Sequence, residues 1–275
     1  MMPIHHVAIR DTRLAVHSSG SGLPLLLLHA FPLDHSMWSR QTSLADHLRI
    51  IAPDLRGFGA SADVGPESIA QLADDAVALL DALHVGRPAA VCGVSMGGYV
   101  AQHIAARHPD RVAALVLVDT KLEADTPETR AARVDLSAKV GRLGLSILAD
   151  AMIPRLMAPV AANADAKTTA RHRDNEADLR RMIIGQRVGT IQAALAALGD
   201  RPDMSEPMRH VRAPTLLVVG ADDQLTPPEC LEAAEKIIPD ARLLIVPRAG
   251  HLTPLEAPEV FNAAVREFLG ELVRR

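Results

Sequence analysis

The chain has 275 residues, of which 48% are hydrophobic and 2% are aromatic, and its formal net charge is −4 at pH 7. This length suits one large α/β domain or one domain with an insertion. The apolar fraction is enough for a sizeable core, packed mainly by aliphatic side chains. The weakly acidic balance, without runs of like charge, disfavours nucleic acid and anionic membrane surfaces as partners.

The cysteines and the N-terminus indicate the compartment. Cys92 and Cys230 are the two cysteines, which is too few for a disulfide framework. The first six residues lack the basic segment and apolar core of a secretory signal. Residues 25–28 form an apolar run that is far too short to span a bilayer. We therefore expect a cytoplasmic protein without a membrane partner, present as a monomer or a homodimer.

Strand and helix patterns alternate through the first part of the chain. Residues 4–18 have the pattern of two short strands joined at Asp11-Thr12. Further predicted elements are strands at 24–29, 49–53, 89–92 and 112–118, and helices near 38–48, at 69–83 after a capping Ser68, and at 99–107. This alternation predicts an α/β fold with a mostly parallel sheet and helices on both faces.

The alternation stops after Asp119. Residues 122–202 contain helical stretches and no strand-like run, and Thr126-Pro127 is a good helix start signal. The pattern resumes with strands at 214–220 and 242–246 and helices near 228–238 and at 258–273. We expect a helical cap, or lid, formed by residues 122–202 and inserted into a core of residues 1–121 and 203–275.

The first chemical motif is a serine on a tight turn. Gly93-Val94-Ser95-Met96-Gly97 follows a predicted buried strand and precedes a predicted helix. A Cβ atom at either glycine would collide with the neighbouring strand or helix, so glycine is required on both sides of the turn. The turn lifts the Ser95 hydroxyl clear of the sheet and favours a role as nucleophile. Its neighbour Met96 offers a backbone N–H beside the same position.

An acid and a histidine follow in the order that a serine nucleophile needs. Asp222 and Asp223 stand just after the strand at 214–220, and His251 stands in the loop after the last strand. The histidine takes the serine proton, and an acid holds the imidazole in the correct tautomer. We favour Asp223 as the acid because it lies three residues before Thr226-Pro227, where the loop turns away. Asp222 is the alternative.

A third piece is the segment His29-Ala30-Phe31-Pro32 after an early strand. The backbone N–H groups of Phe31 and Met96 are predicted to stabilise the oxyanion that forms on an attacked carbonyl. His29 is expected to bond loop backbone and shape this turn. The carboxylate of Asp119, at the end of another strand, is expected to anchor a loop.

Together these segments resemble the α/β-hydrolase superfamily over nearly the whole chain. The matching motifs are His29-Ala30-Phe31-Pro32, Asp54-x-Arg56-Gly57-x-Gly59-x-Ser61, Gly93-x-Ser95-x-Gly97-Gly98, Gly220-x-x-Asp223-x-x-Thr226-Pro227 and Gly250-His251. The chain is most similar to the small cytoplasmic carboxylesterases and 3-oxoadipate enol-lactonases. One departure is Ala30, where the superfamily usually has glycine. Alanine is accommodated there if the φ angle is negative.

The resemblance implies a serine hydrolase that cleaves a small-molecule ester or lactone through an acyl-enzyme on Ser95, without metal or organic cofactor. A thioester of a small apolar acid is a related substrate. Two alternatives use the same triad: C–C bond hydrolysis of a vinylogous diketone, and cofactor-free perhydrolase or haloperoxidase activity. Four cap arginines are candidates for holding a substrate carboxylate: Arg133, Arg155, Arg180 and Arg187.

Overall fold

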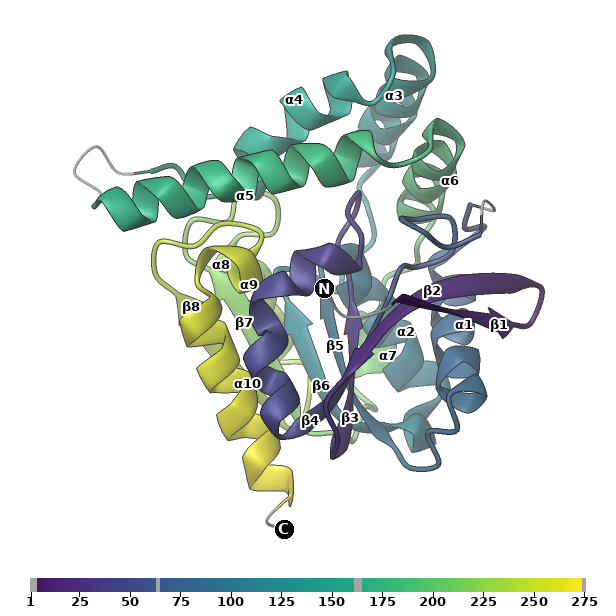
Figure 1. Cartoon of the computed structure of the whole chain (residues 1–275), viewed down its shortest axis with the longest axis vertical. Helices are drawn as coiled ribbons and strands as arrows, with labels where there is room; N and C mark the ends of the chain where they lie inside the picture. The colour runs from purple at the N-terminus through teal and green to yellow at the C-terminus, as the bar shows by residue number, and fades with distance from the viewer. Residues whose placement is uncertain (1–3, 63–64, 161–164, 274–275) are drawn as a thin grey trace.

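A single sheet runs through the centre of the molecule (Figure 1). The computed structural model describes residues 4–62, 65–160 and 165–273, so residues 1–3, part of the segment inspected for a secretory signal, lie outside it. Eight strands follow the order β1-β2-β4-β3-β5-β6-β7-β8. β1 and β2 pair antiparallel, as do β2 and β4, and the other neighbours are parallel. The predicted fold class is confirmed.

The strand bounds agree with the sequence patterns to within two residues. The strands are β1 Ile4–Ile9, β2 Thr12–Ser19, β3 Leu23–Leu28, β4 Leu48–Pro53, β5 Ala89–Val94, β6 Val112–Val118, β7 Thr215–Gly220 and β8 Ala241–Val246. The helices are η1 His35–Asp46, α1 Ile69–Ala82, α2 Met96–Arg107, η2 Pro109–Arg111, α3 Pro127–Leu143, α4 Ser146–Leu156, α5 Ala166–Ile184, α6 Val188–Gly199, α7 Ser205–Met208, α8 Pro228–Glu235, α9 Thr253–Glu256 and α10 Pro258–Val273.

The helix expected near residues 38–48 is misplaced in the prediction. The structure has a run of 3-10 turns, η1, that begins at His35 and ends at Asp46. It starts early because the Asp34 carboxylate accepts a hydrogen bond from the Ser36 N–H at 2.8 Å and caps it. It ends early because Leu48 already pairs with Leu23 of β3.

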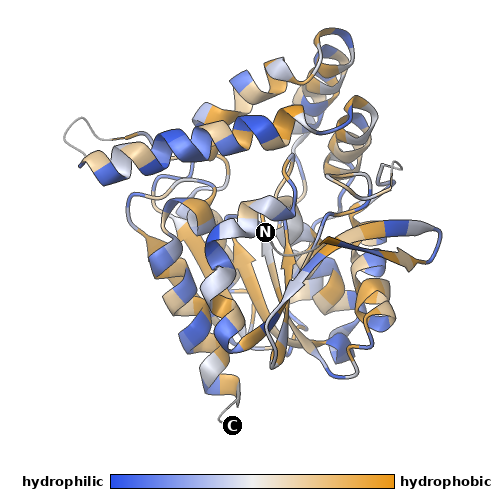
Figure 2. Cartoon of the chain, in the orientation of Figure 1, coloured by the Kyte–Doolittle hydropathy of each residue, from blue (hydrophilic) through white to orange (hydrophobic). Residues whose placement is uncertain are grey.

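Helices cover both faces of the sheet, as predicted. α1 and α2 pack on one face, and η1 and α10 pack on the other (Figure 1). Every residue of β5 is buried, because the central strands are covered on both sides. Figure 2 shows the central strands as largely hydrophobic, whereas α5 is largely hydrophilic. The core therefore lies along the central strands and between them and the two helix layers.

The helices α3 to α6 follow β6 and lie together beyond one end of the sheet (Figure 1). Within the described residues of the segment 122–202 there is no strand, which agrees with the sequence pattern. The two connections to the rest of the chain touch, since the Met204 N–H donates to the Leu122 carbonyl at 2.9 Å. The division into a core and a cap at 122–202 remains our proposal.

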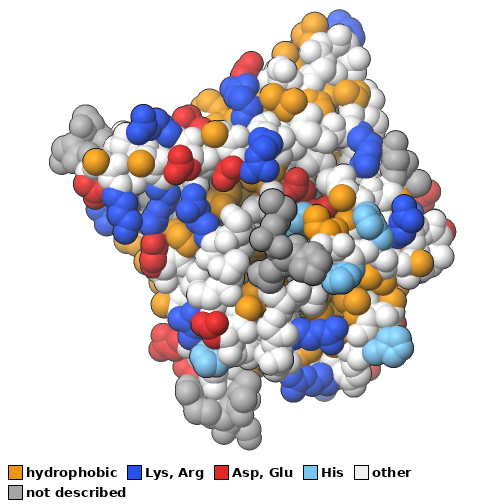
Figure 3. Space-filling view, viewed as in Figure 1, with side chains coloured by type: hydrophobic (Ala, Val, Ile, Leu, Met, Phe, Trp, Pro, Cys, Tyr) orange, Lys and Arg blue, Asp and Glu red, His pale blue; other side chains and the backbone are white. Residues whose placement is uncertain are grey.

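The surface over α5 is highly charged. Figure 3 shows cationic and anionic side chains intermixed there. Among the helices of the described residues, none combines the length and apolarity needed to cross a bilayer.

Candidate active site

Ser95 sits at the carboxyl end of β5, where the strand turns sharply into α2. Its φ of 52° is left-handed, which is rare for a residue with a side chain and marks a strained position. The backbone holds it there, because the Ser95 N–H donates to the Val118 carbonyl and its carbonyl accepts from the Tyr99 N–H. The side chain is half-buried and has no hydrogen-bond partner within the described part of the chain.

The two glycines of the turn are required for the reason given by the sequence argument. A Cβ atom at Gly93 would lie 2.0 Å from the Gly97 carbonyl oxygen of α2. A Cβ atom at Gly97 would lie 2.1 Å from the carbonyl oxygen of Leu28, at the end of β3. The turn is therefore wedged between its own helix and the neighbouring strand. The strand order reverses at β3, because β4 lies on one side of it and β5 on the other. Open α/β sheets form their binding sites at the carboxyl ends of the strands beside such a reversal.

The structure brings Asp223 and His251 together. Asp223 follows β7 and His251 follows β8, and the Nδ1 atom of His251 lies 2.8 Å from Oδ2 of Asp223. Thr226 supports the carboxylate, with its N–H 3.1 Å from Oδ1 and its Oγ1 2.8 Å from Oδ2. Both partners are almost completely buried. The pair therefore has the geometry of an imidazole held in one orientation by a carboxylate.

Electrostatics favour the ion-paired state of this couple. Burial acts to lower the pKa of His251, but its hydrogen bond with Asp223 and the nearby negative charges outweigh burial and raise the pKa above its usual value. Burial acts to raise the pKa of Asp223, and the bond with His251 reverses this and lowers it. The imidazole is therefore more basic than a free histidine, which suits a proton acceptor.

The alternative acid Asp222 does not contact His251 in any described hydrogen bond or ion pair. It is exposed, and its N–H donates to the Ala249 carbonyl at 2.9 Å. The hydroxyl of Ser95 also makes no described hydrogen bond with His251. Bonds of this kind often tighten only when substrate binds. The structure thus joins two of the three predicted catalytic side chains directly and places the third at the end of a nearby strand.

The predicted oxyanion turn lies beside the serine. Ala30 does not have a left-handed φ, because the described non-glycine residues with such an angle are Arg10, His84, Ser95, Asp119 and Arg248. Alanine is thus accommodated where glycine is usual. Within the described residues, the N–H groups of Phe31 and Met96 make no hydrogen bond to a protein acceptor. Their role as oxyanion donors remains our proposal.

His29 shapes this turn, as the sequence predicted. Its Nδ1 lies 3.0 Å from the Ala30 carbonyl oxygen, and its Nε2 accepts the Leu55 N–H at 3.0 Å. Burial lowers the pKa of His29, so the ring is neutral and uses one nitrogen as donor and the other as acceptor. The histidine therefore ties the loop after β3 to the loop after β4.

Asp119 anchors two loops of the site. Its Oδ1 accepts the Gly220 N–H at 3.0 Å, before the Asp223 loop. Its two oxygens also accept the Thr253 N–H and hydroxyl, both at 2.9 Å. Burial, together with the charge of Asp223, raises the pKa of Asp119 to about 7. The expectation of a loop anchor is confirmed, and the loops that it joins carry the acid and the histidine.

Three of the four candidate cap arginines are engaged elsewhere. Arg133 is paired with Asp125, and Arg180 is paired with Asp150. Arg187 donates to the carbonyls of Gly57 and Ser61. These contacts give Arg133, Arg180 and Arg187 structural roles, and Arg155 is exposed at the end of α4.

One group of possible metal ligands occurs among the described residues: Asp34, His35 and Asp54, with ligand atoms within 4.8 Å of one another. Internal hydrogen bonds already use these atoms. His35 Nδ1 lies 2.6 Å from Asp54 Oδ1, and Asp34 Oδ1 accepts from the Ser36 N–H and hydroxyl. The group fits a structural role in fixing the start of η1.

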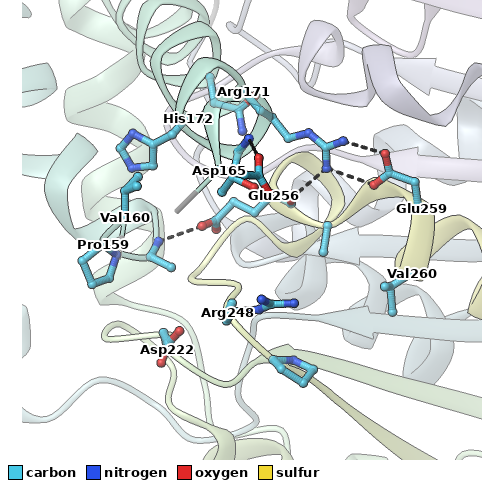
Figure 4. Close-up of a pocket in the computed structure, with 15 residues that line it drawn as sticks. Pro159, Val160, Asp165, Arg171, His172, Asp222, Arg248, Glu256, Glu259 and Val260 are labelled. Atoms are coloured by element: carbon cyan, nitrogen blue, oxygen red, sulfur yellow. Dashed lines mark hydrogen bonds and ion pairs between the residues drawn. The ribbon is translucent and has the colours of Figure 1, made fainter. Parts of the chain in front are cut away.

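A cavity of about 650 Å³ lies outside the predicted site, between α5 and the loops after β7 and β8 (Figure 4). Asp222, Arg248, Arg171 and Glu256 are among its lining residues, and Ser95 and His251 are not. Its charged groups are of both signs, and Arg171 is already paired with Glu259. The lining of this cavity therefore does not include the residues predicted to be catalytic.

Comparisons with known proteins show the family of the chain. The sequence profile of the alpha/beta hydrolase fold matches residues 24–258. The structure of a thermophilic esterase from Thermogutta terrifontis is 36% identical, with a TM-score of 0.90 over 98% of this chain and 99% of that one. The enol-lactonase from Burkholderia xenovorans LB400 is 28% identical, with a TM-score of 0.87 over 97% of this chain and 100% of that one.

A further relative is named putative carbamate hydrolase RutD, from Caulobacter sp. (strain K31). It is 33% identical over 244 residues, which are 85% of each chain. The relatives thus include an esterase, an enol-lactonase and a protein named for carbamate hydrolysis, all of them hydrolases. The chain therefore belongs to the alpha/beta-hydrolase family, among hydrolases that include esterases and an enol-lactonase.

Proposed function

We propose that this hydrolase cleaves small carboxylic esters or lactones through an acyl-enzyme on Ser95. The observation that carries the proposal is the buried Asp223–His251 pair, 2.8 Å apart, at the sheet edge where the strained turn presents Ser95. The esterase and the enol-lactonase to which the chain is similar support this substrate class.

The proposed reaction has two halves. The Ser95 hydroxyl attacks the carbonyl carbon, and Nε2 of His251 takes its proton. The N–H groups of Phe31 and Met96 stabilise the oxyanion, each by about 3 kcal/mol. The C–O bond to the leaving group then breaks, and His251 returns the proton to that oxygen. A water molecule, deprotonated by His251, attacks the acyl-enzyme and releases the acid and free Ser95.

Hydrolysis of p-nitrophenyl acetate and butyrate tests this proposal. We expect the wild-type chain to release p-nitrophenol and Ser95→Ala to lose about 10⁴-fold or more in kcat, because the nucleophile is gone. Ser137→Ala, a serine on α3, serves as the control and should keep the wild-type rate. Activity that survives in Ser95→Ala would refute the assignment. A series of acyl chain lengths and lactone ring sizes then defines the substrate.

The relative named putative carbamate hydrolase supports a second candidate substrate class. The same attack on a carbamate carbonyl would leave a carbamoyl group on Ser95. Mass spectrometry of the intact chain after incubation with a p-nitrophenyl carbamate distinguishes the two classes. Rapid turnover of the carbamate with no accumulation of carbamoylated chain favours a carbamate substrate. Slow release of the carbamoyl group from Ser95, together with fast turnover of the ester, favours an ester substrate.

A further inference from the structure

Glu256, in the short helix α9, makes three hydrogen bonds to backbone N–H groups. Its Oε1 accepts from Gly250 at 3.0 Å and from Leu252 at 3.2 Å. Its Oε2 accepts from Ala158 at 2.7 Å, as the dashed line in Figure 4 shows. Gly250 and Leu252 are the two neighbours of His251, and Ala158 lies between α4 and α5. One carboxylate thus joins the histidine loop, residues 247–252, to the inserted helices.

The backbone of His251 itself touches the same inserted segment. Its N–H donates to the Leu156 carbonyl at 3.1 Å. A Cβ atom at Gly250 would lie 2.4 Å from the Ala158 nitrogen, so the two backbones are in direct contact. The N–H groups of residues 250, 251 and 252 are therefore all held, two by Glu256 and one by the 156–158 segment.

We propose that Glu256 is a positioning residue for His251, and that it couples the catalytic histidine to the 156–158 segment. This rests on the proposed function, in which the imidazole must reach both Ser95 and a leaving group. Proton transfer needs heavy atoms within hydrogen-bond reach, and a displacement of about 1 Å can cost about 10²-fold in rate. Asp223 holds the Nδ1 atom of the imidazole ring, and Glu256 holds the backbone on both sides of His251.

Three variants separate this role from simple attachment of the inserted helices. Glu256→Ala removes all three bonds. Glu256→Gln keeps the shape, but its NH₂ group must face at least one of the three N–H donors. Glu259→Gln is the control, because Glu259 also joins α10 to α5, through Arg171 at 2.6 Å, without touching the histidine loop.

Two measurements follow, on full-length chains shown to be folded by circular dichroism. With p-nitrophenyl butyrate, we expect kcat to fall about 10- to 100-fold in Glu256→Ala and several-fold in Glu256→Gln. KM should stay within about twofold, because the lost interaction orients a catalytic group rather than substrate. Glu259→Gln should keep the wild-type kcat. Wild-type kcat in Glu256→Gln, or an equal loss in Glu259→Gln, would overturn the proposal.

The second measurement is the titration of the His251 ring by ¹H–¹⁵N NMR. The titratable acids whose charge acts on this ring are Asp223, Asp119 and Glu256. Glu256→Gln removes one negative charge, and Glu256→Ala removes the charge and also loosens the bond to Asp223. We expect the pKa of the imidazole to fall in both variants and further in Glu256→Ala. Equal values in the two folded variants would refute positioning.

The titration needs no substrate, so the two proposals fail separately. A wild-type chain that hydrolyses no ester, lactone or carbamate refutes the proposed function, while the titration still tests whether Glu256 positions His251. If Glu256→Ala does not fold, Glu256→Gln alone decides through its kcat and KM.

Discussion

At the scale of single residues, the orientation of His251 depends on a carboxylate that has an acidic neighbour. Asp223 is buried and bonded to the ring, whereas Asp222 is exposed and faces the cavity outside the site. The two acids are adjacent in the sequence and identical in chemistry. They therefore form a matched pair for testing the catalytic assignment.

We expect Asp223→Asn to lower kcat about 10⁴-fold, because an amide favours the wrong tautomer of the histidine. Asp222→Asn should leave kcat nearly unchanged.

The wild-type pH profile of kcat/KM should fall on the acid side as His251 is protonated. Because the pKa of His251 is raised, this fall should begin above pH 6.5. Steady-state rates between pH 5 and 9 check both expectations. A profile that is flat across this range would contradict a general-base role.

The sequence predicted the residues whose position follows from strand ends. Ser95 and Asp223 come after the buried strands β5 and β7, His251 comes after the edge strand β8, and parallel strands end at one edge of a sheet. Glu256 could not be found in this way, because its partners are backbone N–H groups of residues 250, 252 and the distant 158. The one available signal was its place in a short segment directly after the histidine.

At the scale of elements, the strand-to-helix turn is fixed by backbone contacts that leave no room for a side chain at Gly93 or Gly97. The helix α2 begins at Met96, three residues before the predicted start, because Ser95 takes the whole reversal at one left-handed residue. Helix propensity alone predicts that the helix begins at residue 99, with the alanine-rich run. The geometry of the turn moves the start of α2 to Met96.

Gly97→Ala should destabilise the fold by about 3 kcal/mol or more, since its Cβ atom would lie 2.1 Å from the Leu28 carbonyl oxygen and neither backbone can retreat easily. Gly189→Ala in α6 is the control, because a Cβ atom there meets nothing within 4 Å. It should be neutral or stabilise the helix by up to about 1 kcal/mol. Urea unfolding of both variants gives the comparison, and equal stabilities would contradict the packing argument.

At the scale of the whole molecule, a buried cluster ties both ends of the segment 122–202 to α2. Arg201, after α6, donates to Oδ1 of Asp125, before α3, at 2.6 Å, and both side chains are almost fully buried. The Arg201 guanidinium also lies 4.2 Å from the centre of the Tyr99 ring on α2. The cluster thus joins both connections of the insertion to the helix that follows Ser95. No spacing in the sequence indicated it, because its members are brought together only by the fold.

Arg201→Ala should destabilise the chain by about 3–5 kcal/mol, because it leaves the buried Asp125 carboxylate without one of its two arginine partners. Arg180→Ala breaks an exposed pair with Asp150 and should cost less than about 1 kcal/mol. Urea unfolding followed by circular dichroism measures both. A loss for Arg201→Ala no larger than that of the control would contradict the role of the cluster.

The hydrogen bond between Met204 and Leu122 has a consequence for how such proteins diversify. Because the chain departs from the sheet and rejoins it at adjacent points, everything between those points is topologically a surface loop. Insertions, deletions or replacements within that loop leave the register of every strand pair in the sheet unchanged. We therefore propose that the helices between these points are an exchangeable part, provided that each replacement still offers a backbone carbonyl to the His251 N–H.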